Sequence, residues 1–199
     1  VKPNTIAELC ASLFPTIGNR LVISVAAGIQ SGTLQAGLGA SVPIIRCMPN
    51  TPALVQAGMT GLFATPNVTD AQKQSAENIL SAIGLLEWFS HESDLDAVTA
   101  VSGSGPAYFF LVIEAMEAAA VELGLTPEVA HQLVTQTALG AAMMARDSAD
   151  PVSILRNNVT SPGGTTAAAI NSLTEDQIPA IFARAIASAH KRSIELANE

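Results

Sequence analysis

The segment of the chain with the clearest potential for chemistry is residues 157–169, which read NNVTSPGGTTAAA. A Pro-Gly-Gly turn at 162–164 leads directly into a predicted helix that begins with Thr165 and Thr166. Glycines let the backbone approach a ligand closely, and a helix N-terminus presents free N–H groups at the positive end of the helix dipole. Because the Ser161 hydroxyl lies beside them, the pattern predicts a cradle for a small anion. An ordinary loop in which Ser and Thr cap a helix fits the same pattern.

Two further segments place small or polar residues where an α/β fold binds ligands. A predicted strand runs into residues 46–52 (RCMPNTP), and the carboxyl ends of strands in open α/β sheets are binding positions, so Asn50 and Thr51 are candidate hydrogen-bonding groups. A strand followed by an ordinary turn with two prolines explains them equally well. Residues 25–28 (VAAG) end another predicted strand with small side chains, as close approach of a cofactor requires. Residues 101–108 (VSGSGPAY) lack the spacing of a dinucleotide-binding fingerprint and predict a tight turn between helices.

Strong catalytic acids, bases and metal ligands are sparse. The three histidines have no common neighbourhood in the sequence: His91, His131 and His190. Three carboxylates gather where a helix N-terminus would stabilise negative charge: Glu92, Asp94 and Asp96. No metal-ligand spacing occurs, so we expect no metal. Hydride transfer fits such a chain because the cofactor carries the chemistry.

The elements that must position these groups change in character near residue 91. Before it, β-rich runs alternate with helical stretches, which is typical of βαβ units and a mainly parallel sheet. The predicted strands are residues 21–26, 43–48, 59–64 and 85–89, and the predicted helices are residues 5–14, 31–38 and 70–83. We therefore predict an α/β domain at residues 1–91.

The remaining residues, 92–199, predict an all-helical domain. Its longest apolar helix, 107–123, is apolar nearly all round, which indicates burial on every side. In so small a domain, burial requires a second subunit. Gly124 suits a left-handed C-cap, and Thr126 with the following proline predicts a new helix start. Further helices are predicted to about residue 146, after Pro151, at 165–173 and at 178–197.

Composition narrows the possible partners. Charged residues make up 13% of the 199 residues and hydrophobic residues 49%, which favours a large buried subunit interface. The net charge of -8 argues against binding of nucleic acid. A membrane span needs roughly 20 apolar residues, and the strongest run, 107–113, is followed by Glu114 and Glu117. Two lone cysteines, Cys10 and Cys47, and the absence of a signal-peptide pattern at the start predict a soluble, cytoplasmic protein.

Taken together, these segments resemble one family. The residues that carry the resemblance are VKP at 1–3, SVAAG at 24–28, IRCMPNTP at 45–52, DAVTAVSGSGPAY at 96–108 and NNVTSPGGTT at 157–166. The chain is similar to the Δ1-pyrroline-5-carboxylate reductases, the enzymes of the last step of proline synthesis. The resemblance implies hydride transfer from NADPH or NADH to the C=N carbon of pyrroline-5-carboxylate, giving L-proline. It also implies helical domains that interlock into dimers and assemble further, commonly as decamers.

The resemblance assigns the site residues in two groups. The cofactor would be lined by Val1, Lys2, Val25, Ala26 and Ala27 of the α/β domain and by Asn158 of the helical domain. The substrate would be bound by Glu92, Ser161, Gly164, Thr165 and Thr166. Backbone N–H groups of the two threonines and the Ser161 hydroxyl would hold the substrate carboxylate. The Thr166 hydroxyl would orient the imine nitrogen and relay a proton, which makes Thr166 the catalytic candidate.

One feature of the family is not found in this sequence. In the family, VKP follows earlier strands, the first of which opens into a glycine-rich turn that holds the cofactor pyrophosphate. The 199 residues contain no such turn, so the resemblance implies that residues 1–91 are the later part of a Rossmann-type nucleotide-binding domain. Whether they are active by themselves is open, and so is the choice between NADPH and NADH, because the residues that read the ribose lie in the earlier part.

Two other classes of protein fit parts of the pattern. A β-hydroxyacid dehydrogenase has the same order of domains but uses a catalytic lysine on its long helix, and residues 107–123 contain none. A non-catalytic oligomerisation or ligand-sensing protein descended from the reductase would explain the absent glycine-rich turn.

Overall fold

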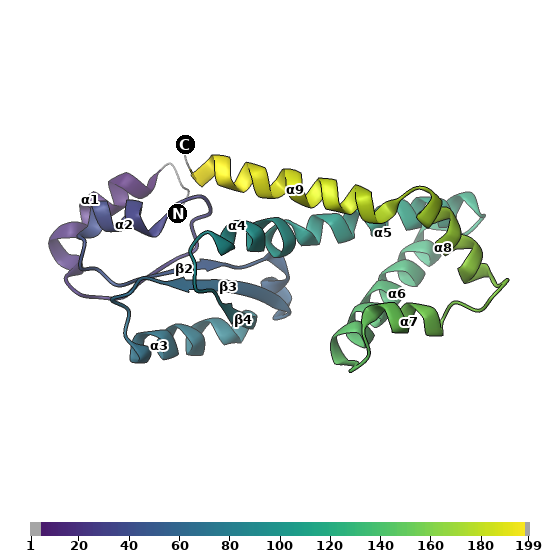
Figure 1. Cartoon of the computed structure of the whole chain (residues 1–199), viewed down its shortest axis with the longest axis horizontal. Coiled ribbons are helices and arrows are strands. Elements are labelled where there is room, and N and C mark those ends of the chain that lie inside the picture. The colour runs from purple at the N-terminus through teal and green to yellow at the C-terminus, as the bar shows by residue number, and fades with distance from the viewer. Residues whose placement is uncertain (1–4, 198–199) are drawn as a thin grey trace. The chain divides into compact units, whose positions relative to one another are not determined.

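The computed structural model describes residues 5–197, and these form two compact units (Figure 1). The first unit runs through Pro106 and takes in the chain again from Ala185, and the second is Ala107–Arg184. The end of the last helix thus belongs to the unit that holds the sheet. The predicted domain boundary between residues 91 and 92 stays a prediction.

A four-stranded sheet forms the centre of the first unit, in the order β1-β2-β3-β4. Its strands are Val22–Ser24, Ile44–Met48, Gly58–Ala64 and Gly84–Trp88, each within about two residues of a predicted strand. β1 pairs with β2 and β3 with β4 in parallel, but β2 and β3 are antiparallel. The expectation of a mainly parallel sheet therefore holds for two pairs and is wrong for the central one. The reason is that residues 49–57, which join β2 to β3, are fewer than the dozen or so that a parallel crossover needs.

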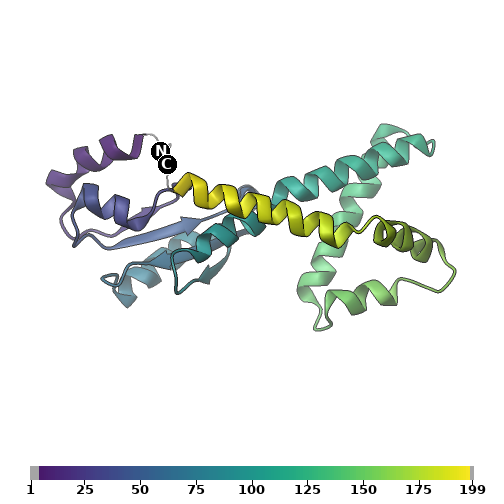
Figure 2. The same cartoon turned by 45° about the horizontal axis from the view of Figure 1, so that its top comes forward.

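Helices cover both faces of this sheet, because successive strand residues point to opposite faces. Ile44 packs into a core with α1 (Ile6–Ile17) and α2 (Ser31–Leu38). The next residue, Ile45, packs into a second core with α3 (Asp70–Leu80). In the views of Figures 1 and 2, α1 and α2 lie on one side of the sheet and α3 on the other. Burial on both faces is what the predicted α/β class requires.

Local signals explain where several of these helices begin and end. α3 starts with a capping box, in which Thr69 and Gln72 satisfy each other's backbone N–H groups. α1 continues through Pro15, beyond the predicted end at residue 14, and stops at Gly18 with a φ of 54°. That positive φ is a conformation that glycine adopts without steric cost, so the glycine and not the proline ends the helix.

Two short 3₁₀-helices, Thr51–Val55 and Ser81–Ile83, precede β3 and β4, and the elements after β4 are all helical. They are α4 (Asp94–Val98), a π-helical turn at Thr99–Gly103, α5 (Gly105–Glu122), α6 (Pro127–Asp147), α7 (Val152–Asn158), α8 (Thr165–Glu175) and α9 (Ile178–Ala197). Gly124 has a φ of 96°, and the Thr126 hydroxyl accepts a hydrogen bond from the Val129 N–H, so the predicted stop and restart between α5 and α6 are confirmed. The α/β region followed by helices confirms the predicted fold class.

Apolar side chains of α5 are exposed in the single chain. Phe109 is 71% exposed, Phe110 63% and Leu111 65%. The helical stretch Asp94–Glu122, 29 residues long, is long and apolar enough by length and composition to cross a membrane. A buried interface helix of a soluble protein meets the same two criteria, so length and composition alone do not make this stretch a membrane span.

Candidate functional site

The N-terminus of α8 is open. Gly164 is the N-cap residue, with φ -83° and ψ 172°, and no side chain caps the helix. The first backbone bond at this end of the helix runs from the Ala168 N–H to the Gly164 carbonyl at 3.1 Å. The N–H groups of Thr165, Thr166 and the residue after them therefore point out of the helix end, where they can donate to an anion.

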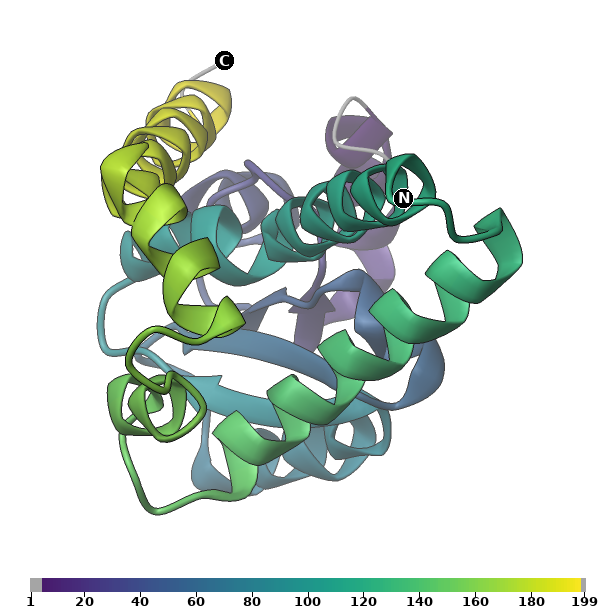
Figure 3. The ribbon, with the colours of Figure 1, turned by 90° about the vertical axis from the view of Figure 1, so that its right-hand side faces the viewer.

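Figure 3 shows the ribbon of the turn that joins α7 to α8, and this turn contains Gly163 and Gly164. Gly163 has a φ of 73°, which side-chain-bearing residues rarely adopt. The Gly164 N–H donates to the Ser161 carbonyl at 3.0 Å, and a Cβ on Gly164 would lie only 3.1 Å from that oxygen. The turn is therefore tight, and it places the exposed Ser161 next to the exposed Thr165 and the half-buried Thr166. That this turn is an anion cradle stays a prediction.

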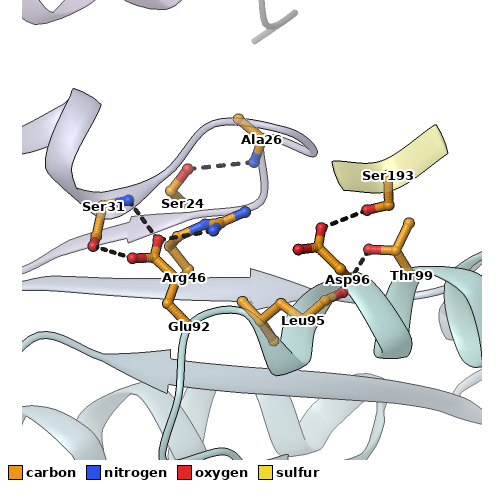
Figure 4. A network of polar contacts seen from close by, with 9 residues as sticks. All are labelled: Ser24, Ala26, Ser31, Arg46, Glu92, Leu95, Asp96, Thr99 and Ser193. Atoms are coloured by element: carbon orange, nitrogen blue, oxygen red, sulfur yellow. Dashed lines mark hydrogen bonds and ion pairs between the residues drawn. The ribbon is translucent and has the colours of Figure 1, made fainter. Parts of the chain in front are cut away.

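A second candidate surface lies on the loop that follows β1 in the first unit. The Ser24 hydroxyl accepts a hydrogen bond from the Ala26 N–H at 3.3 Å, which bends the chain directly after the strand (Figure 4). Val25 is 56% exposed, and Ala27 is exposed as well. The loop therefore offers backbone and short side chains at the carboxyl end of a strand, where open α/β sheets bind nucleotides. These residues fit a nicotinamide cofactor.

Glu92 holds the start of α2. Its Oε1 accepts from the Ser31 backbone N–H and its Oε2 from the Ser31 hydroxyl, both at 2.6 Å. Arg46 on β2 adds a hydrogen-bonded ion pair, with Nη1 2.8 Å from Oε1. Partial burial raises the pKa of Glu92, but the hydrogen bonds from Ser31 and Arg46 and the charge of Arg46 outweigh it, and the net pKa lies below the ordinary value. The carboxylate is therefore ionised at neutral pH.

The structure gives other candidate residues a structural use. The Asn50 amide donates to the carbonyl and hydroxyl of Ser102, both at 3.2 Å, and accepts from the Met59 N–H at 2.9 Å. Asn50 thus ties the ends of two strands to the π-helical turn. Burial raises the pKa of the Cys47 thiol to about 12, so this cysteine stays protonated and is no nucleophile. Within residues 5–197, no group of His, Cys, Asp and Glu side chains that could hold a metal is found.

The predicted site residues fall on both units. In the first unit, Val25, Ala26 and Ala27 lie in the loop between β1 and α2, and Glu92 bonds the first residue of α2. In the second unit, the sites lie on α7, the turn and α8: Asn158, Ser161, Gly164, Thr165 and Thr166. Val1 and Lys2 lie outside the described residues. Sequence reasoning missed Ser31 and Ser193, whose hydroxyls bond to carboxylates 61 and 97 positions away. No local pattern signals such distant partners.

Comparison with known proteins gives consistent matches. A family model described as pyrroline-5-carboxylate reductase dimerisation matches residues 92–196. A pyrroline-5-carboxylate reductase of Pseudomonas aeruginosa is 48% identical over 200 residues, covering 100% of this chain and 73% of that protein. One from Pasteurella multocida is 44% identical over 198 residues, covering 98% of this chain and 72% of that protein.

Solved structures agree with these sequence matches. A pyrroline-5-carboxylate reductase from Coxiella burnetii superposes with a TM-score of 0.95 at 45% identity, covering 99% of this chain and 74% of that one. A pyrroline carboxylate reductase from Plasmodium falciparum with NADP bound has a TM-score of 0.92 at 34% identity, covering 99% and 79%.

The fold, the curated relatives and the NADP-bound neighbour place the chain among the nicotinamide-dependent oxidoreductases that have an α/β region followed by a helical domain. Within that class, the sequence identity of 48% and 44% to two reductases, over 73% and 72% of their lengths, shows the family. The chain belongs to the pyrroline-5-carboxylate reductase family. Because the matched model describes a dimerisation region, it accounts for the exposed apolar side chains of α5 by a second subunit.

Proposed function

We propose that this chain acts in the reduction of the C=N bond of 1-pyrroline-5-carboxylate to L-proline, with NADPH or NADH as the second substrate. Membership of the family supports the reaction, and the NADP bound to the Plasmodium falciparum relative supports the cofactor. The single observation within the chain that carries the proposal is the open N-terminus of α8 behind the Ser161–Gly164 turn. This helix end suits the carboxylate of a small substrate whose reduction needs no metal and no strong acid.

In this proposal the substrate carboxylate is bound by backbone groups. The N–H groups of Thr165 and Thr166 donate to its two oxygens, and the Ser161 hydroxyl donates to one of them. Hydrogen bonds of this kind to an ionised carboxylate are stronger than those between neutral groups. Gly164 acts by having no side chain, because an N-cap oxygen from Ser, Thr or Asp would take one of these N–H groups for itself.

The Thr166 hydroxyl has a different task, which is to orient the ring nitrogen. When bound, the cofactor supplies a hydride to the carbon of the C=N bond, and the nitrogen takes up a proton as the bond becomes single. A threonine hydroxyl is far too weak an acid to give its own proton away. Thr166 therefore orients the nitrogen and relays a proton from solvent, while the held geometry supplies most of the rate.

The residues of the first unit complete the site on the cofactor side. Val25, Ala26 and Ala27 line the nicotinamide with small side chains and backbone, and Asn158 contacts the cofactor from the helical domain. Val1 and Lys2 belong to the same proposed set. Glu92 belongs to the substrate site, where its bonds to Ser31 and Arg46 support a fixed, ionised carboxylate.

Assembly is also part of the proposal. Dimers formed through the helical domain assemble further, up to a decamer, and the enzyme acts in the cytoplasm without nucleic acid or membrane as partner. The net charge of -8 and the apolar surface of α5 support this. Light scattering of the purified protein tests the assembly, and a particle of the monomer mass would contradict it.

The reaction is tested with the full-length purified protein. Oxidation of NADPH is followed with 1-pyrroline-5-carboxylate as substrate, and the product is identified as L-proline by mass spectrometry and chiral chromatography. We expect turnover that depends on both substrates. A protein that binds NADPH but forms no proline would contradict the proposal. A β-hydroxyacid with NADP⁺ serves as the control, and no NADPH formation is expected there because α5 contains no lysine.

A further inference from the structure

The last turns of α9, which belong to the sheet-containing unit, contact another part of that unit through a polar side chain. Ser193 is 8% exposed, and it is the one buried residue of α9 within the described part of the chain. Helices usually bury apolar side chains, so a lone buried serine needs a reason. Its hydroxyl donates to Asp96 Oδ1 at 2.7 Å, as Figure 4 shows. Hydrogen bonds to carboxylates are among the stronger ones in proteins.

The same end of α9 also lies against the loop that follows β1. Gly28 in this loop has a φ of 75°, and a Cβ added there would be 3.2 Å from the Leu196 carbonyl oxygen. The backbone of the loop and the backbone of α9 are therefore in close contact at this point. Gly28 directly follows Val25–Ala27, the residues proposed to line the nicotinamide.

Several contacts hold the loop between β1 and α2, among them a hydrogen bond of 3.3 Å from the Ile29 N–H to the Ala26 carbonyl. Its first end is bent by the bond between Ser24 and Ala26, and its last end is fixed where Glu92 bonds Ser31. Its middle rests on α9 at Gly28. The carboxylate that anchors α9, Asp96, follows Glu92 within the same short segment of the chain.

Apolar packing contributes to the position of the loop as well, because Ala26 and Ile29 pack against the first core. Next to the loop and the end of α9 lies a pocket of about 200 Å³, lined by Gln30, Arg46, Glu92, Ser93, Asp96 and Ala197. On the side of this pocket, the hydrogen bonds and the contact at Gly28 add to the apolar packing in holding the loop.

We propose that the C-terminal end of α9 positions the cofactor loop: Ser193, bonded to Asp96, seats Leu196 against Gly28 and so holds Val25–Ala27 in the conformation that receives the nicotinamide. Ser193 and Leu196 are positioning residues and do not touch substrate. The inference rests on the proposed function, because it assumes that this loop binds NADPH. It predicts a defect that is specific to the cofactor.

The test compares variants of the full-length protein in direct NADPH binding, measured by calorimetry without substrate, and in steady-state kinetics. Ser193→Ala removes one hydrogen bond to a carboxylate, so we expect the Kd and KM for NADPH to rise about tenfold. The KM for pyrroline-5-carboxylate should stay within about twofold of the parent, since the α8 cradle is untouched. Ser193→Thr keeps the hydroxyl and should restore NADPH affinity.

Ser75→Ala is the matched control, because Ser75 is a helical serine whose hydroxyl bonds only the carbonyl one turn before it, at 2.8 Å. Asp96→Asn keeps an acceptor oxygen and gives a milder version of the same test if Ser193→Ala does not fold. The inference is overturned if Ser193→Ala, or failing that Asp96→Asn, binds NADPH like the parent. It is also overturned if affinity for both substrates falls together and threonine does not restore it. If the parent binds NADPH but forms no proline, the proposed function is overturned. The comparison of NADPH binding between the variants and the parent then still tests whether α9 positions the loop.

Discussion

Both carboxylate oxygens of Glu92 accept hydrogen bonds from Ser31, a residue 61 positions earlier in the chain. One bond comes from the backbone N–H and the other from the hydroxyl, each at 2.6 Å, so the side chain acts as a cap for α2 from outside that helix. Arg46 completes the arrangement as a partly buried ion pair, with its side chain 13% exposed and that of Glu92 25%. The start of α2 is thereby tied to β2 and to the segment that leads into α4.

Glu92→Gln should make stability less dependent on pH in acid. The pKa of Glu92 is lower in the folded protein than its ordinary value of 4.5, so the charged form stabilises the fold above that pH, and this stabilisation is lost as the pH falls through the lowered pKa. We expect the variant to lose about 1–3 kcal/mol of unfolding free energy at neutral pH and to approach the parent in acid. Urea unfolding at a series of pH values measures this.

Glu87→Gln provides the control for that series, because Glu87 is an exposed carboxylate on β4. Its unfolding free energy should stay within about 0.5 kcal/mol of the parent at each pH. A Glu92→Gln variant that kept the same deficit from neutral to acid pH would show that the charge of Glu92 does not stabilise the fold.

Thr166→Ala should lower turnover, since the proposed orienting hydroxyl is lost. A reduction of kcat/KM by about 10²-fold is expected, and Thr166→Ser should recover most of it. Thr174→Ala is a matched control on the same helix, because the Thr174 hydroxyl bonds only the Ile170 carbonyl one turn earlier. Steady-state kinetics of the three variants decide the matter, and unchanged kinetics of Thr166→Ala would remove Thr166 from the mechanism.

Thr165→Pro should weaken substrate binding without breaking α8. Proline is well tolerated at the first position of a helix, and the extended backbone of Gly164 suits a residue that precedes proline. The variant loses one N–H donor to the carboxylate, so the KM for pyrroline-5-carboxylate should rise about tenfold. Thr165→Ala keeps that N–H and should bind like the parent. Equal KM values for the two variants would argue that this N–H does not contact the substrate.

Phe109→Glu should dissociate the dimer. The Phe109 side chain is 71% exposed in the single chain and lies within the matched dimerisation region. A charge buried in an interface without a partner is costly, so the variant should elute as a smaller particle in size-exclusion chromatography with light scattering. Ile79→Glu is the control, because Ile79 is 63% exposed on α3, outside that region. A Phe109→Glu protein of parental size would place the interface elsewhere.

Elements whose signals are local could be predicted from the sequence. α2 was predicted at residues 31–38 and has those bounds, and the stop at Gly124 and restart at Thr126 follow from a flexible glycine and a capping hydroxyl. The antiparallel pairing of β2 with β3 was missed because alternating elements alone indicate parallel strands. The short connection at residues 49–57 contained the information, since it cannot cross over a sheet.

By itself, the sequence determined the family, the order of elements and the Pro-Gly-Gly turn with its neighbouring hydroxyls, because each depends on residues that are neighbours in the chain. Only the tertiary structure decided which partners the isolated polar groups have. Both oxygens of Glu92 accept hydrogen bonds from Ser31 and one is also paired with Arg46, and the Ser193 hydroxyl donates to Asp96. Hydrogen bonds reach only about 3 Å, so partners 61 or 97 positions apart are matched by the packing of whole elements and leave no local pattern.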